Sequence, residues 1–137
     1  MTKPTLFHTL SFDDADAGLA FLTALGFTEQ LVERNADDPT TVEHAQLAWG
    51  DCGGVMCGSA RRPGDATEPD GYQRRVGAGS CYLVVASDAD VDVVYERALA
   101  AGARGTQPPP DQDYGGRGAT VTDAEGNQYS IGSYAGA

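Results

Sequence analysis

A repeated start-and-stop pattern is the feature of this sequence that most constrains its fold. Asp-Ala-Asp at residues 14–16 precedes an apolar stripe that ends at Gly26, and Asp-Ala-Asp at residues 88–90 precedes a second stripe that ends at Gly102. Aspartate at a helix start accepts hydrogen bonds from free backbone N–H groups, and glycine after the last turn lets the chain leave the helix. The offset is nearly constant, so the chain contains an internal repeat with one helix in each copy.

Strand patterns surround each predicted helix in the same order. Alternating or β-rich segments bounded by turn residues cover residues 5–12, 27–33, 42–49 and 55–57, and then residues 80–86, 104–107, 118–122 and 128–133. Each half therefore has the order β-α-β-β-β. The segment between the halves, rich in Arg, Gly, Pro and Asp, has no periodicity and is typical of a loop.

We predict an α+β fold made of two tandem βαβββ modules. With 137 residues the chain is close to the usual size of one domain, so we expect a single domain over residues 1–137, with module one at about 4–59, a linker at about 60–78 and module two at about 79–134. One helix can cover only one face of each sheet. The modules should therefore form a cupped, mixed β-sheet with the helices on its convex side.

Charge excludes some classes of partner. The net charge of −11 repels nucleic acid backbones and anionic lipid surfaces, so we expect no nucleic acid and no membrane partner. The same charge either only keeps the protein soluble or also attracts a cationic ligand. The N-terminus has no apolar signal region and no stretch reaches the roughly 18 apolar residues of a membrane span, so we expect a cytoplasmic protein.

The cysteine pattern agrees with a reducing compartment. Cys52, Cys57 and Cys81 are an odd number without a C-x-x-C pair, which argues against a disulfide framework or a zinc knuckle. We predict reduced thiols, with Cys57 and Cys81 buried in strands.

Two sequence motifs resemble those of a known family. Residues 10–14 (LSFDD) followed by residues 21–27 (FLTALGF) are similar to its strand and "FYxxxLGF" helix, and residues 122–127 (TDAEGN) are similar to its "DPxGN" hairpin, with Ala124 in place of the commoner proline. The family is the vicinal oxygen chelate superfamily of glyoxalase I, extradiol dioxygenases, fosfomycin-resistance enzymes and bleomycin-binding proteins. The resemblance covers nearly the whole chain.

The resemblance also implies where a metal would bind. Metal-dependent members hold their ion with His or Glu side chains from four strands that face the cup. The matching positions here are Phe7, Met56 or Cys57, Ser80 and Ser130. These residues supply no imidazole or carboxylate donor for Ni, Zn, Fe or Mn. We therefore expect no metal ligands and no cofactor, which argues against glyoxalase and dioxygenase chemistry.

Without the metal, the cup remains a concave cavity for a small molecule. Alternation along the strands predicts its lining, and aromatic or cationic residues near strand ends predict its rim. The predicted ligand-binding residues are Phe7, Thr9, Ser11, Met56, Ser80, Tyr82, Gln128 and Ser130 in the lining, and Trp49, Tyr114 and Arg117 at the rim.

Three functions are compatible with this pattern. The first is a binding protein that resembles the bleomycin-resistance branch and holds a planar or aromatic small molecule, for which the acidic charge would suit a cationic antibiotic. The second is a lyase or dioxygenase-type enzyme with a displaced metal site built from His8, His44 and Glu43 or Asp51. His8 stands two residues before Leu10 on the same strand, so both side chains should point to the face that packs under the helix. This favours a structural role for His8 instead. The third is a metal-free enzyme, but no nucleophile and base can be paired from the sequence.

The resemblance also bears on the number of chains. In related proteins the modules pair within one chain or between two, and the predicted linker permits either arrangement. We expect a homodimer.

Overall fold

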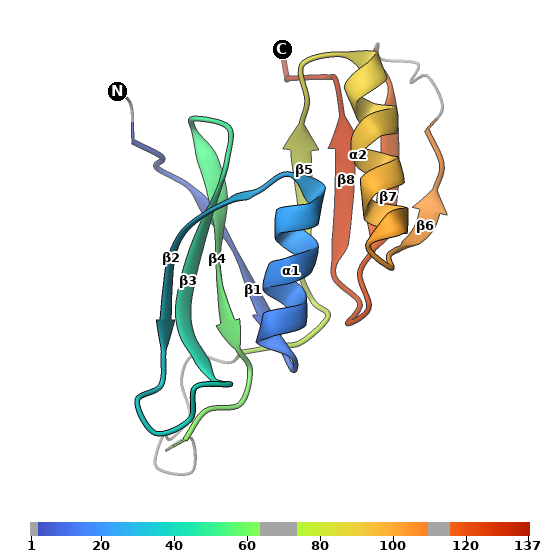
Figure 1. Ribbon diagram of the computed structural model, residues 1–137. Coiled ribbons are helices and arrows are strands. Elements are labelled where there is room, and N and C mark those ends of the chain that lie inside the picture. The colour runs from blue at the N-terminus through green and yellow to red at the C-terminus, as the bar shows by residue number, and fades with distance from the viewer. Residues whose placement is uncertain (1–2, 64–73, 110–115) are drawn as a thin grey trace.

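The two halves follow one another along the chain with the same order of elements (Figure 1). The computed structural model describes residues 3–63, 74–109 and 116–137. The first half consists of β1 (Phe7–Phe12), α1 (Ala15–Leu25), β2 (Thr28–Arg34), β3 (Val42–Trp49) and β4 (Gly53–Ser59). The second consists of β5 (Ser80–Val84), α2 (Asp88–Ala100), β6 (Arg104–Gln107), β7 (Gly118–Thr122) and β8 (Gln128–Gly132). The predicted βαβββ repeat is confirmed, while most of the predicted linker lies outside the described residues.

The helix ends follow the repeated sequence pattern, with one shift. Asp14 caps α1 by accepting a hydrogen bond from the backbone N–H three residues on (3.1 Å), and Gly26 ends it with φ of 129°. In α2 the capping residue is Ser87, whose Oγ accepts from the N–H of Asp90 (3.2 Å), so the helix cap predicted at Asp88 is wrong by one residue. Serine and aspartate are both good caps, and local pattern alone does not choose between neighbours.

Each half forms its own four-stranded mixed sheet. The strand orders are β1-β4-β3-β2 and β5-β8-β7-β6, so the two sheets have the same topology. The pairs β1–β4 and β5–β8 are parallel, and the remaining pairs are antiparallel. The α+β fold of two tandem modules is therefore confirmed, and it contains two open sheets.

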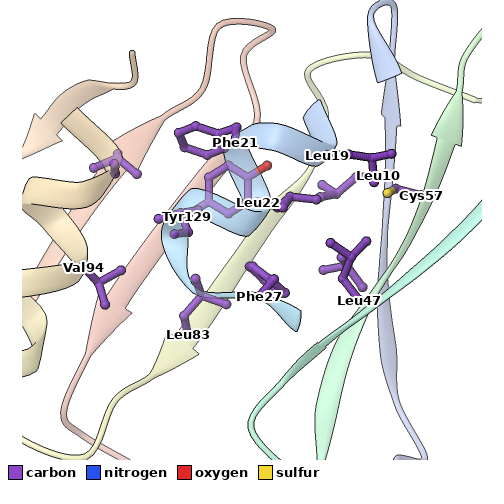
Figure 2. Packing of buried hydrophobic residues seen from close by; sticks show 14 of the residues in the cluster. Leu10, Leu19, Phe21, Leu22, Phe27, Leu47, Cys57, Leu83, Val94 and Tyr129 are labelled. Atoms are coloured by element: carbon purple, nitrogen blue, oxygen red, sulfur yellow. The ribbon is translucent and has the colours of Figure 1, made fainter. Parts of the chain in front are cut away.

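Both helices pack into one hydrophobic cluster that includes residues of both halves. The apolar stripe of α1 contributes Leu19, Leu22 and Leu25, all buried in this cluster. Figure 2 shows Leu19 beside Leu10 of β1 and Cys57 of β4. The ring of Phe21 on α1 contacts that of Tyr129 on β8, with centroids 5.5 Å apart. The two helices also contact each other. Burial of apolar surface thus joins the halves, although their sheets are separate.

The hairpin between β7 and β8 is a buried hydrogen-bonded joint. Asp123 Oδ1 accepts from the N–H groups of Glu125 (2.9 Å) and Asn127 (3.0 Å), and its Oδ2 accepts from the hydroxyl of Tyr129 (2.8 Å). Asn127 Oδ1 in turn accepts from the N–H of Gly79 (2.9 Å), just before β5. Buried polar groups need such partners. This explains the Asp-x-x-Gly-Asn pattern as a structural motif.

Glu125 extends this joint into the first half. Its Oε1 accepts from the N–H of Asp13 (2.5 Å) and its Oε2 from the N–H of Asp14 (2.9 Å), directly before α1. A carboxylate is favoured at this end of a helix because free N–H groups point toward it. One side chain of the second half therefore holds the start of the first helix.

Neither helix of the described chain has the length and apolar character needed to cross a membrane.

Candidate functional site

Each sheet has one face under its helix and one face without a helix, which we call the open face. On β1, Leu10 and Phe12 are buried under α1, so Phe7 and Thr9 alternate with them and lie on the open face. Thr9 pairs with Met56 on β4, which places Met56 on the same face, while Cys57 is buried on the helix side. Ser11 has the same parity but is buried beside Val76 in the approach to β5.

The second sheet repeats this arrangement. Ser80 on β5 pairs with Gln128 on β8, and Tyr82 pairs with Ser130, all on the open face. Next to them, the hydroxyls of Thr120 on β7 and Ser130 lie 3.1 Å apart. Apart from the buried Ser11, the structure thus places the predicted lining residues in two rows, one on each sheet. Their part in ligand binding stays a prediction.

The lining was predicted mainly from the alternation of side chains along β1, β5 and β8, which does not identify the open-face residues of β2 and β3. His44 and Gln46 on β3 lie on this face because Gln46 pairs with Met56. Leu31 on β2 pairs with Gln46 and is 42% exposed. A register shift between Glu29 and Leu31 interrupts the regular alternation of faces along β2. Alternation in the sequence therefore does not show that Leu31 lies on the open face.

A pocket of about 510 Å³ lies at the open face of the second sheet, which we call the open-face pocket. Its walls include Tyr82, Val84 and Tyr134, which are 46%, 43% and 39% exposed. The Tyr82 hydroxyl donates to the backbone oxygen of Tyr134 (2.7 Å), and its ring lies so close to Gly132 that any Cβ there would overlap it. Exposed apolar and aromatic surface of this kind is typical of a binding region.

The predicted rim residues have other positions. Trp49 lies on the helix side of β3, where its Nε1 donates to the backbone oxygen of Val84 (2.8 Å). The guanidinium of Arg117 binds the carboxylate of Asp92 on α2 (3.1 Å) and is thereby directed toward the helix. Tyr114 lies outside the described residues.

The open face does not fit a hard metal ion at the positions implied by the resemblance. Register resolves the uncertain position as Met56, because Cys57 points into the core. The four side chains are then a benzyl group, a thioether and the hydroxyls of Ser80 and Ser130. A neutral donor set of this kind is a poor match for Ni, Zn, Fe or Mn.

The residues of the alternative metal site are also separated. His8 lies on the helix side of β1 and His44 on the open face of β3. Glu43 accepts a hydrogen bond from Asn35 (2.9 Å), and Asp51 lies in the turn after β3. Across residues 3–63, 74–109 and 116–137, no three His, Cys, Asp or Glu side chains of one chain are placed to hold a metal ion.

All three cysteines are free thiols. Burial raises the pKa of Cys57 to about 11 and that of Cys81 to about 12, so both stay protonated near neutral pH. Cys57 is buried as predicted, whereas Cys81 is only partly buried. Neither thiol has the low pKa of a nucleophile.

Comparison with known proteins identifies the family. The model described as the Glyoxalase/Bleomycin resistance protein/Dioxygenase superfamily matches residues 5–131. TioX from Micromonospora sp. ML1 is a similar solved structure, with 27% identity over 93% of this chain and 95% of that chain and a TM-score of 0.71. A glyoxalase-related enzyme from Fulvimarina pelagi shares the fold at 21% identity over 90% and 83% of the two chains (TM-score 0.67). No curated protein matches the sequence significantly.

Proposed function

Because this chain belongs to the glyoxalase/bleomycin resistance protein/dioxygenase superfamily, we propose that it is a metal-independent binding protein for a planar or aromatic small molecule. The observation that carries this proposal is the neutral side-chain set at the superfamily's metal positions, Phe7, Met56, Ser80 and Ser130. Such side chains bind by stacking, apolar contact and hydrogen bonding. The ligand lies on the open face.

The surface of the open-face pocket supports an aromatic ligand. Tyr82 and Tyr134 offer two partly exposed rings next to the apolar side chain of Val84. The hydroxyl groups of Ser130 and Thr120 add hydrogen-bonding capacity in the neighbouring row. The net charge of −11 favours cationic over anionic ligands, so cationic aromatic antibiotics are suitable candidates.

We also propose that two copies pair through their open faces and enclose the ligand. Leu31, Tyr82 and Val84 support this, because each is a large apolar or aromatic side chain at least 42% exposed on that face. A second copy would remove this surface from water. We place the protein in the cytoplasm, since three free thiols suit a reducing compartment.

The ligand proposal can be tested with proflavine, a planar cation, and acridine, its neutral parent at pH 8. We expect a saturable change of proflavine fluorescence and a higher melting temperature, because a ligand of the native state stabilises it. Acridine should bind more weakly. Tyr82→Ala should weaken proflavine binding about tenfold, through loss of ring stacking and apolar contact.

Val93→Ala is the matched control, because Val93 is 45% exposed but lies on α2. The affinity of the Val93→Ala variant for proflavine should equal that of the wild type. Absence of saturable binding to either dye, or equal losses in both variants, would contradict an open-face site for planar cations.

Light scattering after gel filtration tests the pairing. The wild type should elute with twice the mass of one chain, and Leu31→Glu should produce monomers because it places a charge in the proposed interface. Val93→Glu, the control on α2, should stay dimeric. A monomeric wild type, or a dimer disrupted only by Val93→Glu, would refute pairing through the open face.

A further inference from the structure

A second pocket lies where the end of α1, the end of β5 and one face of α2 meet, and we call it the helix-end pocket. Its volume is about 300 Å³. Its walls include Trp49 of the first half and three side chains of α2, those of Asp90, Val93 and Arg97. It shares only Val84 with the open-face pocket, so it is a separate site.

Asp90 and Arg97 bring opposite charges to this pocket. They stand seven residues apart on α2, which places them on one face of the helix, about 10 Å apart along its axis. In the described part of the chain, neither the carboxylate of Asp90 nor the guanidinium of Arg97 has a hydrogen-bond or ion-pair partner, whereas Arg34, Arg62 and Arg117 each bind a carboxylate. Both charges are therefore available to a ligand.

The end of α1 and the ring of Trp49 lie beside the guanidinium of Arg97. A Cβ on Gly26 would lie 3.4 Å from the Trp49 ring and 3.7 Å from a guanidinium nitrogen. The last turn of α1 has no basic residue, and the C-terminal end of a helix attracts a cation. Trp49 is itself fixed, because its Nε1 donates to the backbone oxygen of Val84 (2.8 Å) and its ring contacts that of Phe27, with centroids 4.9 Å apart. The cationic end of the pocket thus has a preformed aromatic wall.

We propose that the helix-end pocket binds an extended zwitterion, with its ammonium group at Asp90, its carboxylate at Arg97 and an apolar chain between them. A guanidinium binds a carboxylate through two parallel hydrogen bonds. Val93, which is 45% exposed and lies between the two charges along α2, offers apolar contact to the chain together with Trp49. The net charge of −11 repels an anion, whereas a zwitterion is neutral overall.

The ligand 8-aminooctanoate carries these two end groups on an unbranched apolar chain, and three simpler compounds isolate their contributions. Octanoate lacks the ammonium group, octylamine lacks the carboxylate, and glycine holds both groups close together. Trp49 is the only tryptophan in the chain, so its single indole N–H signal in a ¹H–¹⁵N NMR spectrum reports on the pocket. We expect saturable shifts with 8-aminooctanoate, about fivefold weaker binding of octanoate and octylamine, and no binding of glycine.

Two variants locate the interaction, because Trp49 also borders a cavity beside β1. Arg97→Gln should lower the affinity for 8-aminooctanoate about fivefold and leave that for octylamine unchanged. Asp90→Asn should also lower the affinity for 8-aminooctanoate, but it should leave that for octanoate unchanged. Arg104→Gln and Glu96→Gln are the matched controls, since both residues are exposed and neither lines the pocket, and both variants should bind as the wild type does.

The proposal is overturned if the Trp49 signal does not respond to 8-aminooctanoate, if any of the three simpler compounds binds as tightly, or if either charge variant keeps the wild-type affinity. The comparison of ligands uses only the wild-type protein, so it does not depend on the folding of any variant. None of these ligands is planar and aromatic, so failure at this pocket leaves the proposal for the open face intact.

Discussion

Replacing Glu125 with glutamine should lower the free energy of unfolding by about 1–2 kcal/mol. The carboxylate accepts from two backbone N–H groups at the start of α1, those of Asp13 (2.5 Å) and Asp14 (2.9 Å). Glutamine keeps one acceptor oxygen and turns an NH₂ group toward the other N–H. One charge-assisted hydrogen bond is lost, together with the favourable interaction between the negative charge and the helix start. Partial exposure of Glu125 keeps the loss moderate.

Repulsion between carboxylates acts in the opposite direction. Asp13 and Asp14 lie near Glu125 in a chain of net charge −11, so neutralising Glu125 removes some repulsion. Salt screens this repulsion more than it weakens short hydrogen bonds. The destabilisation by Glu125→Gln should therefore be larger at high salt than at low salt.

Thermal and urea unfolding, followed by circular dichroism, measure this effect. For a chain of this length we expect the melting temperature to fall by about 3–8 °C. Glu96→Gln on α2 is the control, because Glu96 is exposed, and its effect should stay within about 0.5 kcal/mol. If Glu125→Gln is as stable as the wild type at high salt, the carboxylate does not hold the start of α1.

Three further substitutions or conditions test the interior. Burial lowers the pKa of His8 from 6.5, so the unfolded chain takes up a proton first as the pH falls. The free energy of unfolding should therefore decrease below pH 6.5. His8→Gln should remove this part of the pH dependence, as measured by urea titrations at several pH values. Tyr129→Phe removes the hydroxyl that donates to Asp123 (2.8 Å) and should cost about 1–2 kcal/mol in urea unfolding; an unchanged midpoint would contradict the buried joint. Gly79→Ala should cost about 1–3 kcal/mol because its Cβ would overlap two neighbouring side chains, whereas Gly53→Ala should leave the melting temperature nearly unchanged.

The repeat and the helices were predictable because their signals are local. The cap at Asp14 and the glycine at Gly26 stand next to the residues whose backbone groups they satisfy or release. The cap of α2 was misplaced by one residue because Ser87 and Asp88 are both competent caps. Local chemistry therefore determines that a helix begins, and tertiary packing selects the residue at which it does.

For the candidate site, the sequence predicted only which face of its strand a side chain occupies. Parity placed Thr9 and Tyr82 on the open face, where the structure has them. The partners of Trp49 and Arg117, which are the backbone oxygen of Val84 and the carboxylate on α2, lie far away in the sequence. No periodic signal identifies such contacts, and the register shift in β2 conceals Leu31 in the same way.

The affinity for proflavine before and after treatment with EDTA, and again after addition of Ni, Zn, Fe or Mn, tests the central claim most directly. We predict one dissociation constant under all these conditions, because Phe7, Met56, Ser80 and Ser130 give a metal ion no suitable donor set. Loss of binding in EDTA, with recovery at one metal ion per chain, would contradict a metal-independent binding site.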